Sequence, residues 1–249
     1  LERRILPAED IELHFASKNP EEENGAVVVS YQSVIPAFKG DGISHPLGLK
    51  STSAIRLLCH MLREPLFDDL RTKQQLGYVV SAYYELGYSS RPDVKQQAAL
   101  GPLSCPVDFI TICILSRKLP PPDITQRIDE FLHVFRESLA SMPESEIRDH
   151  AEALSTKLLK PIQKLQSEAN NHFTKIQRYG PEVFYKQQKE AAATEGGADG
   201  NVKSLDLPWR SVETLARSIE TLERNDLLES WDRMMDPSSR CRVVSCVCG

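Results

Sequence analysis

Alternating and continuous runs of apolar residues predict five β-strands. Residues 26–35 are β-branched and almost continuously apolar, which is typical of a strand covered on one or both faces. The other predicted strands cover residues 11–15, 76–86, 106–115 and 240–247. Because only a loop joins residues 76–86 to residues 106–115, we expect these two strands to pair antiparallel.

Apolar residues at helical spacing predict five helices. The clearest pattern runs from Ile124 to Leu139, where apolar side chains recur every three to four positions. Ser141 and Glu144 have the spacing of a capping box, so Ser141 is the expected N-cap of the next helix. The five predicted helices cover residues 46–64, 124–139, 141–161, 162–179 and 211–235.

The order of these elements is β-β-α-β-β-α-α-α-α-β. This order predicts one α+β domain over residues 1–249, with a mostly antiparallel sheet and helices packed on one face. Residues 89–105 and 187–210 are rich in Gly, Ser, Ala and polar residues, so we expect mobile insertions there. The chain begins with Leu1 rather than Met, and we therefore expect a fragment or an excised domain of a longer protein.

Composition and charge exclude several classes of partner. The net charge is −5 and no basic run is interleaved with aromatic residues, so we expect no nucleic-acid binding. No apolar run has the length of a membrane span, so we expect no membrane partner. The six cysteines contain no C-x-x-C pair and are expected to be mostly buried, reduced thiols. Such thiols favour a cytoplasmic location, with organelles left open.

Known catalytic motifs are missing from the sequence. None of the six histidines forms H-x-x-E-H or H-E-x-x-H, and there is no G-x-S-x-G, Walker A or G-x-G-x-x-G motif. His60/Glu64 and His133/Glu137 stand four residues apart, which favours local surface pairs over a metal site. We therefore expect no metal or other cofactor in this chain, and no activity from the chain alone.

Three lysines suggest a weak anion-binding site. Lys157, Lys160 and Lys164 follow one another at i, i+3 and i+7, so on one helix they would share a face. That face could contact an anionic ligand, or it could simply be solvated.

The segment from Phe67 to Val80 joins a predicted helix to a predicted strand and carries two notable donors. Arg71 presents a fork of N–H groups that suits carboxylates and peptide carbonyls, and Tyr78 presents one hydroxyl on a stiff ring. Together they could hold a peptide. The alternative is a surface arginine beside a tyrosine at a strand edge.

Residues 70–80, Leu-Arg-Thr-Lys-Gln-Gln-Leu-Gly-Tyr-Val-Val, resemble the L-R-T-K-x-Q-L-G-Y-x-V segment of one group of peptidases. This group comprises the insulin-degrading enzyme, nardilysin and pitrilysin, which are inverzincin zinc metallopeptidases. Residues 24–32, 64–70 and 227–231 also resemble segments of the group's last domain. The similarity covers roughly residues 10–249.

The resemblance implies a particular place in a larger enzyme. The group has four homologous α+β domains, of which the first carries the H-x-x-E-H zinc site and the last two close over it to form a chamber for peptides. This chain is similar to the fourth domain, which lacks the zinc motif. The implied function is therefore substrate binding in a zinc metalloendopeptidase, with zinc in the complete enzyme. The implied partners are a peptide substrate and the zinc-bearing N-terminal half of the same or another chain.

The resemblance also implies roles for individual residues. Arg71 matches the arginine that holds peptide carbonyls, and Tyr78 matches the tyrosine that donates a hydrogen bond to the developing oxyanion. Gly77 would allow the tight backbone that presents Tyr78, and Lys164 lies at a basic position of an anion-binding wall. Two other functions stay open. The chain could be a non-catalytic peptide-binding or assembly module, or it could be the zinc-free subunit of a two-chain peptidase.

Overall fold

The protein contains a five-stranded sheet with the strand order β1-β5-β2-β4-β3. This computed structural model describes residues 9–19, 21–33, 46–90, 104–170, 173, 212–238 and 240–248. The strands are β1 (Asp10–Ala16), β2 (Gly25–Ser33), β3 (Val79–Ser90), β4 (Ser104–Ser116) and β5 (Cys241–Cys248). All neighbouring strands pair antiparallel except β1 and β5, which pair parallel. The predicted antiparallel pairing of β3 with β4 is therefore confirmed.

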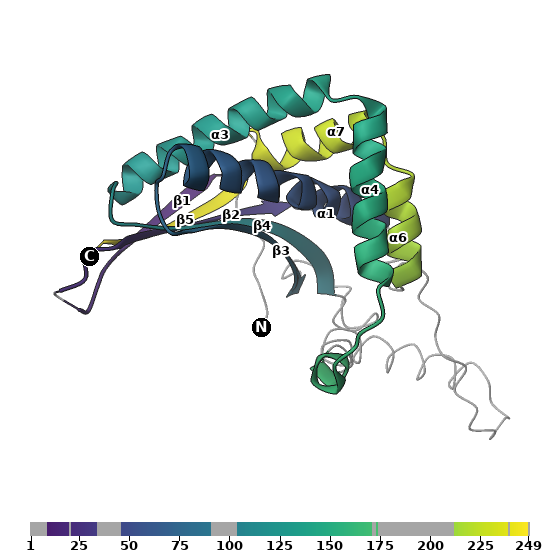
Figure 1. The fold of residues 1–249 in the computed structure, drawn as a ribbon, viewed down its shortest axis with the longest axis horizontal. Coiled ribbons are helices and arrows are strands. Elements are labelled where there is room, and N and C mark those ends of the chain that lie inside the picture. Colours follow the sequence, from purple (N-terminus) through teal and green to yellow (C-terminus); the bar gives the residue numbers. More distant parts are fainter. Residues whose placement is uncertain are drawn as a thin grey trace, which may run out of the picture.

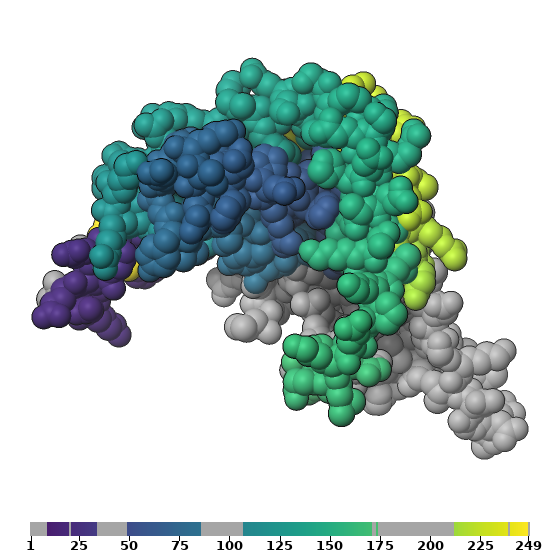
Figure 2. Space-filling view, in the orientation of Figure 1, coloured from purple at the N-terminus to yellow at the C-terminus, as the bar shows by residue number. Residues whose placement is uncertain are grey.

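Helices cover one face of the sheet. Figure 1 shows α1, α3 and α7 lying over this face, whereas α4 and α6 stand together at one end. The helices are α1 (Pro46–Leu66), the π-helix η1 (Phe67–Lys73), α3 (Pro121–Ser141), α4 (Glu144–Leu159), α6 (Val212–Glu220) and α7 (Arg224–Met235). In the space-filling view α1, α3 and α4 occupy most of the visible face (Figure 2). The predicted fold class, α+β with helices on one face, is confirmed.

The period of two along each strand explains why one face is covered. Val27 and Val29 on β2 lie opposite Ile114 and Ile112 on β4, and all four side chains are fully buried beneath the helices. On the outer strand β1, Leu13 and Phe15 point to the opposite face, which the helices do not cover. They are 41% and 53% exposed. The helices therefore cover the face that carries the branched aliphatic residues.

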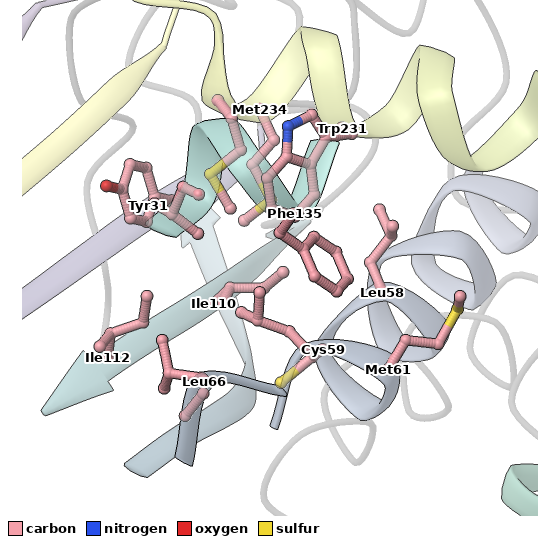
Figure 3. Close-up of a cluster of buried hydrophobic side chains, with 14 of the residues drawn as sticks. Tyr31, Leu58, Cys59, Met61, Leu66, Ile110, Ile112, Phe135, Trp231 and Met234 are labelled. Carbon is pink, nitrogen blue, oxygen red and sulfur yellow. The ribbon is translucent and has the colours of Figure 1, made fainter. Parts of the chain in front are cut away.

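The core lies between this face and the helices. Figure 3 shows Leu58 of α1 beside Phe135 of α3 and Trp231 of α7, with Met61 and Ile110 in the same buried cluster. The ring centroids of Phe135 and Trp231 are 5.1 Å apart, within the range of favourable aromatic pairs. Each fully buried aliphatic side chain of this kind contributes about 1.5–3 kcal/mol relative to an exposed one.

Several predicted boundaries were wrong. The first helix was expected to end near Glu64 but continues to Leu66 and then into η1, so the following strand starts at Val79 and not at residue 76. The region 211–235 contains two helices, and α7 opens with a capping box between Glu223 and Asp226.

The capping box predicted at Ser141 is also absent. Ser141 is the last residue of α3, and its hydroxyl donates to the carbonyl oxygens of Glu137 and Ser138. Pro143 takes the N-cap position of α4, without a hydrogen bond from a side chain.

Both predicted insertions fall largely outside the described residues. Residues 91–103 and 187–210 lie outside them, whereas Ser89 and Ser90 belong to β3 and Ser104 and Cys105 belong to β4. Of the predicted helix 162–179, residues 165–170 are helical and most of the remainder is not described. No helix in the described ranges is long and apolar enough to span a membrane.

Candidate substrate-contact site between α1 and β3

The candidate site is a short connection between α1 and the edge strand β3. It consists of η1 and a loop of residues 74–78, named here the Tyr78 loop. Leu70 and Leu76 are buried and fix the connection to the core, whereas Tyr78 is 61% exposed. The same segment thus holds two apolar anchors and presents polar groups to solvent.

Arg71 and Tyr78 are brought together by this connection. The Nε group of Arg71 donates a hydrogen bond of 3.3 Å to the carbonyl oxygen of Tyr78. The guanidinium carbon of Arg71 lies 5.1 Å from the ring centroid of Phe67, which is 45% exposed. The arginine is therefore held on two sides, and the aromatic contact with Phe67 was not foreseen from the sequence.

The π-helix fixes the path of the loop. Gln74 donates its backbone N–H to the carbonyl oxygen of Asp69 at 2.9 Å, which is the i→i+5 bond of a π-turn. The backbone N–H of Leu76 donates to the carbonyl oxygen of Leu70 at 3.0 Å. Between these two bonds Gln75 adopts a φ of 53°, in the left-handed region that ordinary residues rarely occupy. The chain therefore reverses sharply just before Tyr78.

Gly77 lies against the end of β4. A Cβ atom at this position would lie 2.0 Å from the carbonyl oxygen of Leu115 and 2.9 Å from its carbonyl carbon. No side chain fits at such distances, so the close approach of the two backbones requires glycine.

Two lysines border the site, and each contacts a polar group of the same segment. Lys73 contacts the carboxylate of Asp68 at 2.8 Å, and this hydrogen bond raises the pKa of Lys73. Lys118, from the connection after β4, donates through Nζ to the carbonyl oxygen of Gln74 at 3.1 Å. The site is thus bordered by cationic side chains that already have partners.

The three candidate lysines do not share one helix. Lys157 lies in the last turn of α4, but Lys160 adopts an extended conformation and residues 160–164 are not helical. Pro161 explains the break, because proline disfavours the helical conformation of the residue before it. The helical spacing expected for Lys157, Lys160 and Lys164 was therefore wrong.

The described part of the chain offers no residues suited to zinc. It contains no group of three or more His, Cys, Asp or Glu side chains that could hold a metal ion. His133 and Glu137 form an exposed pair at 3.6 Å, as expected, whereas the ring of His60 packs edge-on against His150. Neither histidine pair therefore provides the ligands of a zinc site.

The cysteines only partly follow the prediction. Cys59, Cys241 and Cys246 are buried, Cys113 is half-buried, and Cys248 is exposed. All five are free thiols.

Comparisons with known proteins agree with the geometry. The family model described as PQQ synthase PqqF-like, C-terminal lobe domain 4, matches residues 57–90 and 106–173, which include Arg71 and Tyr78. A nardilysin-like protein of Arabidopsis thaliana is 26% identical over 175 residues, which are 70% of this chain and 15% of that protein. The human insulin-degrading enzyme is 28% identical over 197 residues, which are 73% of this chain and 17% of that enzyme. The chain thus spans only a small part of these relatives.

Solved structures show the same fold. Pitrilysin superposes with a TM-score of 0.63 at 15% identity, over 98% of this chain and 20% of pitrilysin. A peptidase M16 inactive domain from Pseudomonas fluorescens superposes with a TM-score of 0.52 at 12% identity, over 97% of this chain and 43% of that chain.

The fold is therefore that of a pitrilysin-type peptidase domain. The sequence comparisons identify the relatives more specifically. They match a C-terminal lobe domain model, a nardilysin-like protein and the insulin-degrading enzyme. The chain is a homologue of nardilysin and the insulin-degrading enzyme, it matches a C-terminal lobe domain model, and it shares the fold of pitrilysin, so the resemblance seen in the sequence is confirmed.

Proposed function

We propose that this chain contributes substrate and transition-state contacts to a zinc metalloendopeptidase whose metal is held outside it. The observation that carries the proposal is the joint presentation of Arg71 and Tyr78 by the Tyr78 loop. The match of the C-terminal lobe model across this segment supports it.

Arg71 is suited to hold the backbone of an extended peptide. A guanidinium has five N–H donors and no acceptor, and only the donor at Nε is used by the carbonyl oxygen of Tyr78. The terminal N–H groups can donate to consecutive peptide carbonyls. The ring of Phe67 limits the side chain's freedom, which lowers the entropy lost when a peptide binds.

Tyr78 is suited to stabilise negative charge on the carbonyl oxygen of the bond being cleaved. Its backbone is fixed by the Tyr78 loop while its side chain is exposed, so the phenol can donate a hydrogen bond to a group outside this chain. A donor of this kind acts mainly in the transition state and therefore raises kcat.

These roles require a second protein part that holds the zinc. We propose that a zinc-bearing half, in the same or another chain, faces the Tyr78 loop and encloses the peptide with it. The peptide is the substrate, and Arg71 with Tyr78 contacts it from the side opposite the metal.

The test is the kinetics of Tyr78→Phe in the assembled peptidase. Loss of one such donor should lower kcat by about 100-fold while KM changes little. Tyr83→Phe is the matched control, because Tyr83 is also partly exposed and lies on β3, the strand that follows Tyr78, and it should leave kcat near the wild-type value. An unchanged kcat for Tyr78→Phe would eliminate the transition-state role.

A further inference from the structure

Ser116 is a buried polar residue that lies directly behind the Tyr78 loop. It is the last residue of β4 and is fully buried. Its hydroxyl donates a hydrogen bond to the carbonyl oxygen of Leu76. It also accepts from the backbone N–H groups of Lys118 and Leu119, at 3.0 and 3.3 Å. One donor and two acceptor positions are the full capacity of a hydroxyl, so Ser116 has every partner it can take.

The hydrogen bond to Leu76 completes the attachment of the loop. Leu76 is bound through its N–H to Leu70 in η1 and through its carbonyl oxygen to Ser116 in β4. The next residue, Gly77, is the one whose added Cβ atom would clash with the carbonyl oxygen of Leu115. Leu76, two residues before Tyr78, is therefore fixed between two elements that are distant from each other in the sequence.

We propose that Ser116 is a positioning residue that sets the placement of Tyr78 for the reaction. This inference rests on the proposed function. Ser116 is buried and does not touch the peptide; it acts through Leu76 and Gly77. Without its hydroxyl, the carbonyl oxygen of Leu76 loses a buried partner, and the loop can move relative to β4.

A purely structural role would look different. If Ser116 only stabilised the turn that contains Lys118 and Leu119, its loss would lower stability without a specific effect on Tyr78. Ser155 gives a matched control, because it is also a buried serine and its hydroxyl bonds to Glu220, between α4 and α6 and away from the Tyr78 loop.

The experiment compares Ser116→Ala with Ser155→Ala in the assembled peptidase. Two quantities are measured, amide hydrogen exchange of residues 74–78 and the kinetics of peptide hydrolysis. We expect Ser116→Ala to speed exchange in this loop and to lower kcat by about 10-fold, since displacements near 1 Å can cost about 100-fold. Ser155→Ala should change neither quantity. If Ser116→Ala does not fold, Ser116→Cys is measured in its place, because it keeps the size of the side chain but has only a weak donor.

A double variant identifies the route of the effect. Ser116→Ala should cause no further loss of kcat in a Tyr78→Phe background, because both changes remove the same contribution. An equal loss in both backgrounds, or wild-type exchange in residues 74–78, would overturn the positioning role. A wild-type kcat for Tyr78→Phe alone would instead overturn the proposed function, and with it the catalytic consequence of Ser116.

Discussion

At the scale of single residues, the site depends on backbone geometry more than on its charged groups. Gly77 lies where the backbone of the Tyr78 loop meets the end of β4, and Gln75 turns the chain through a positive φ of 53°. Neither residue needs to touch a peptide. Both fix the position of the backbone from which the side chain of Tyr78 extends.

Gly77→Ala should therefore be destabilising. The new Cβ atom would lie 2.0 Å from a backbone oxygen, so one of the two segments must shift, at a cost of about 1–3 kcal/mol. Gly25→Ala is the control, because its Cβ would meet Pro121 at 3.5 Å, an ordinary contact, and its effect should stay within about 0.5 kcal/mol. Urea unfolding of the two variants measures the difference. Equal stabilities would refute the close approach at Gly77.

The sequence was informative about residues that act locally. Arg71 and Tyr78 lie seven positions apart in one segment, so their meeting could be expected from the motif alone. Ser116 follows Leu76 by 40 positions, and nothing in its local pattern distinguishes it from other serines. Its role depends on strand pairing, which only the folded chain brings about.

At the scale of elements, α4 packs against α1 through a pair of histidines. The ring centroids of His60 on α1 and His150 on α4 are 6.1 Å apart. Burial lowers the pKa of His60, and the nearby His150, Lys157 and Arg63 lower it further, against a small opposing effect of Glu64. A proton on His60 is therefore disfavoured in the folded protein.

This arrangement predicts a loss of stability in mild acid. The pKa of His60 lies below its ordinary value of 6.5 in the folded state, so the unfolded chain binds the proton more readily. Its contribution to stability is present above pH 6.5 and is lost as the pH falls through the folded pKa. The loss should be small, because the ring is partly exposed and solvent screens it.

His60→Asn should weaken this dependence. The free energy of unfolding is compared between about pH 7.5 and about pH 5.5 for wild type, His60→Asn and the exposed control His133→Asn. The wild type and the control should lose similar stability, and His60→Asn should lose less. A His60→Asn variant with the full wild-type pH dependence would show that this histidine pair does not contribute.

Strands were easier to predict than helix ends. The apolar runs of β2 and β4 are long and β-branched, and both strands were found at the expected places. The π-helix η1 was missed because a π-turn has no distinctive sequence pattern and follows α1 without a break. The parallel pairing of β1 with β5 joins the two ends of the described chain, so no local signal could predict it.

At the scale of the whole molecule, the helices cover one side of the sheet, and the candidate site lies at its edge. Figure 1 shows β3 at the margin of the sheet, and Tyr78 directly precedes this strand. Arg71 and Tyr78 present hydrogen-bond donors, but the described residues bring no metal-binding group to them. This arrangement is what we expect of one side of an active site.

The most direct test of this account measures where activity resides. Peptide hydrolysis is followed for three samples with zinc present: this chain alone, the zinc-bearing half alone, and the two together. We expect hydrolysis at full rate only from the combined sample. Zinc-dependent hydrolysis by this chain alone, or full activity of the zinc-bearing half without it, would contradict the account.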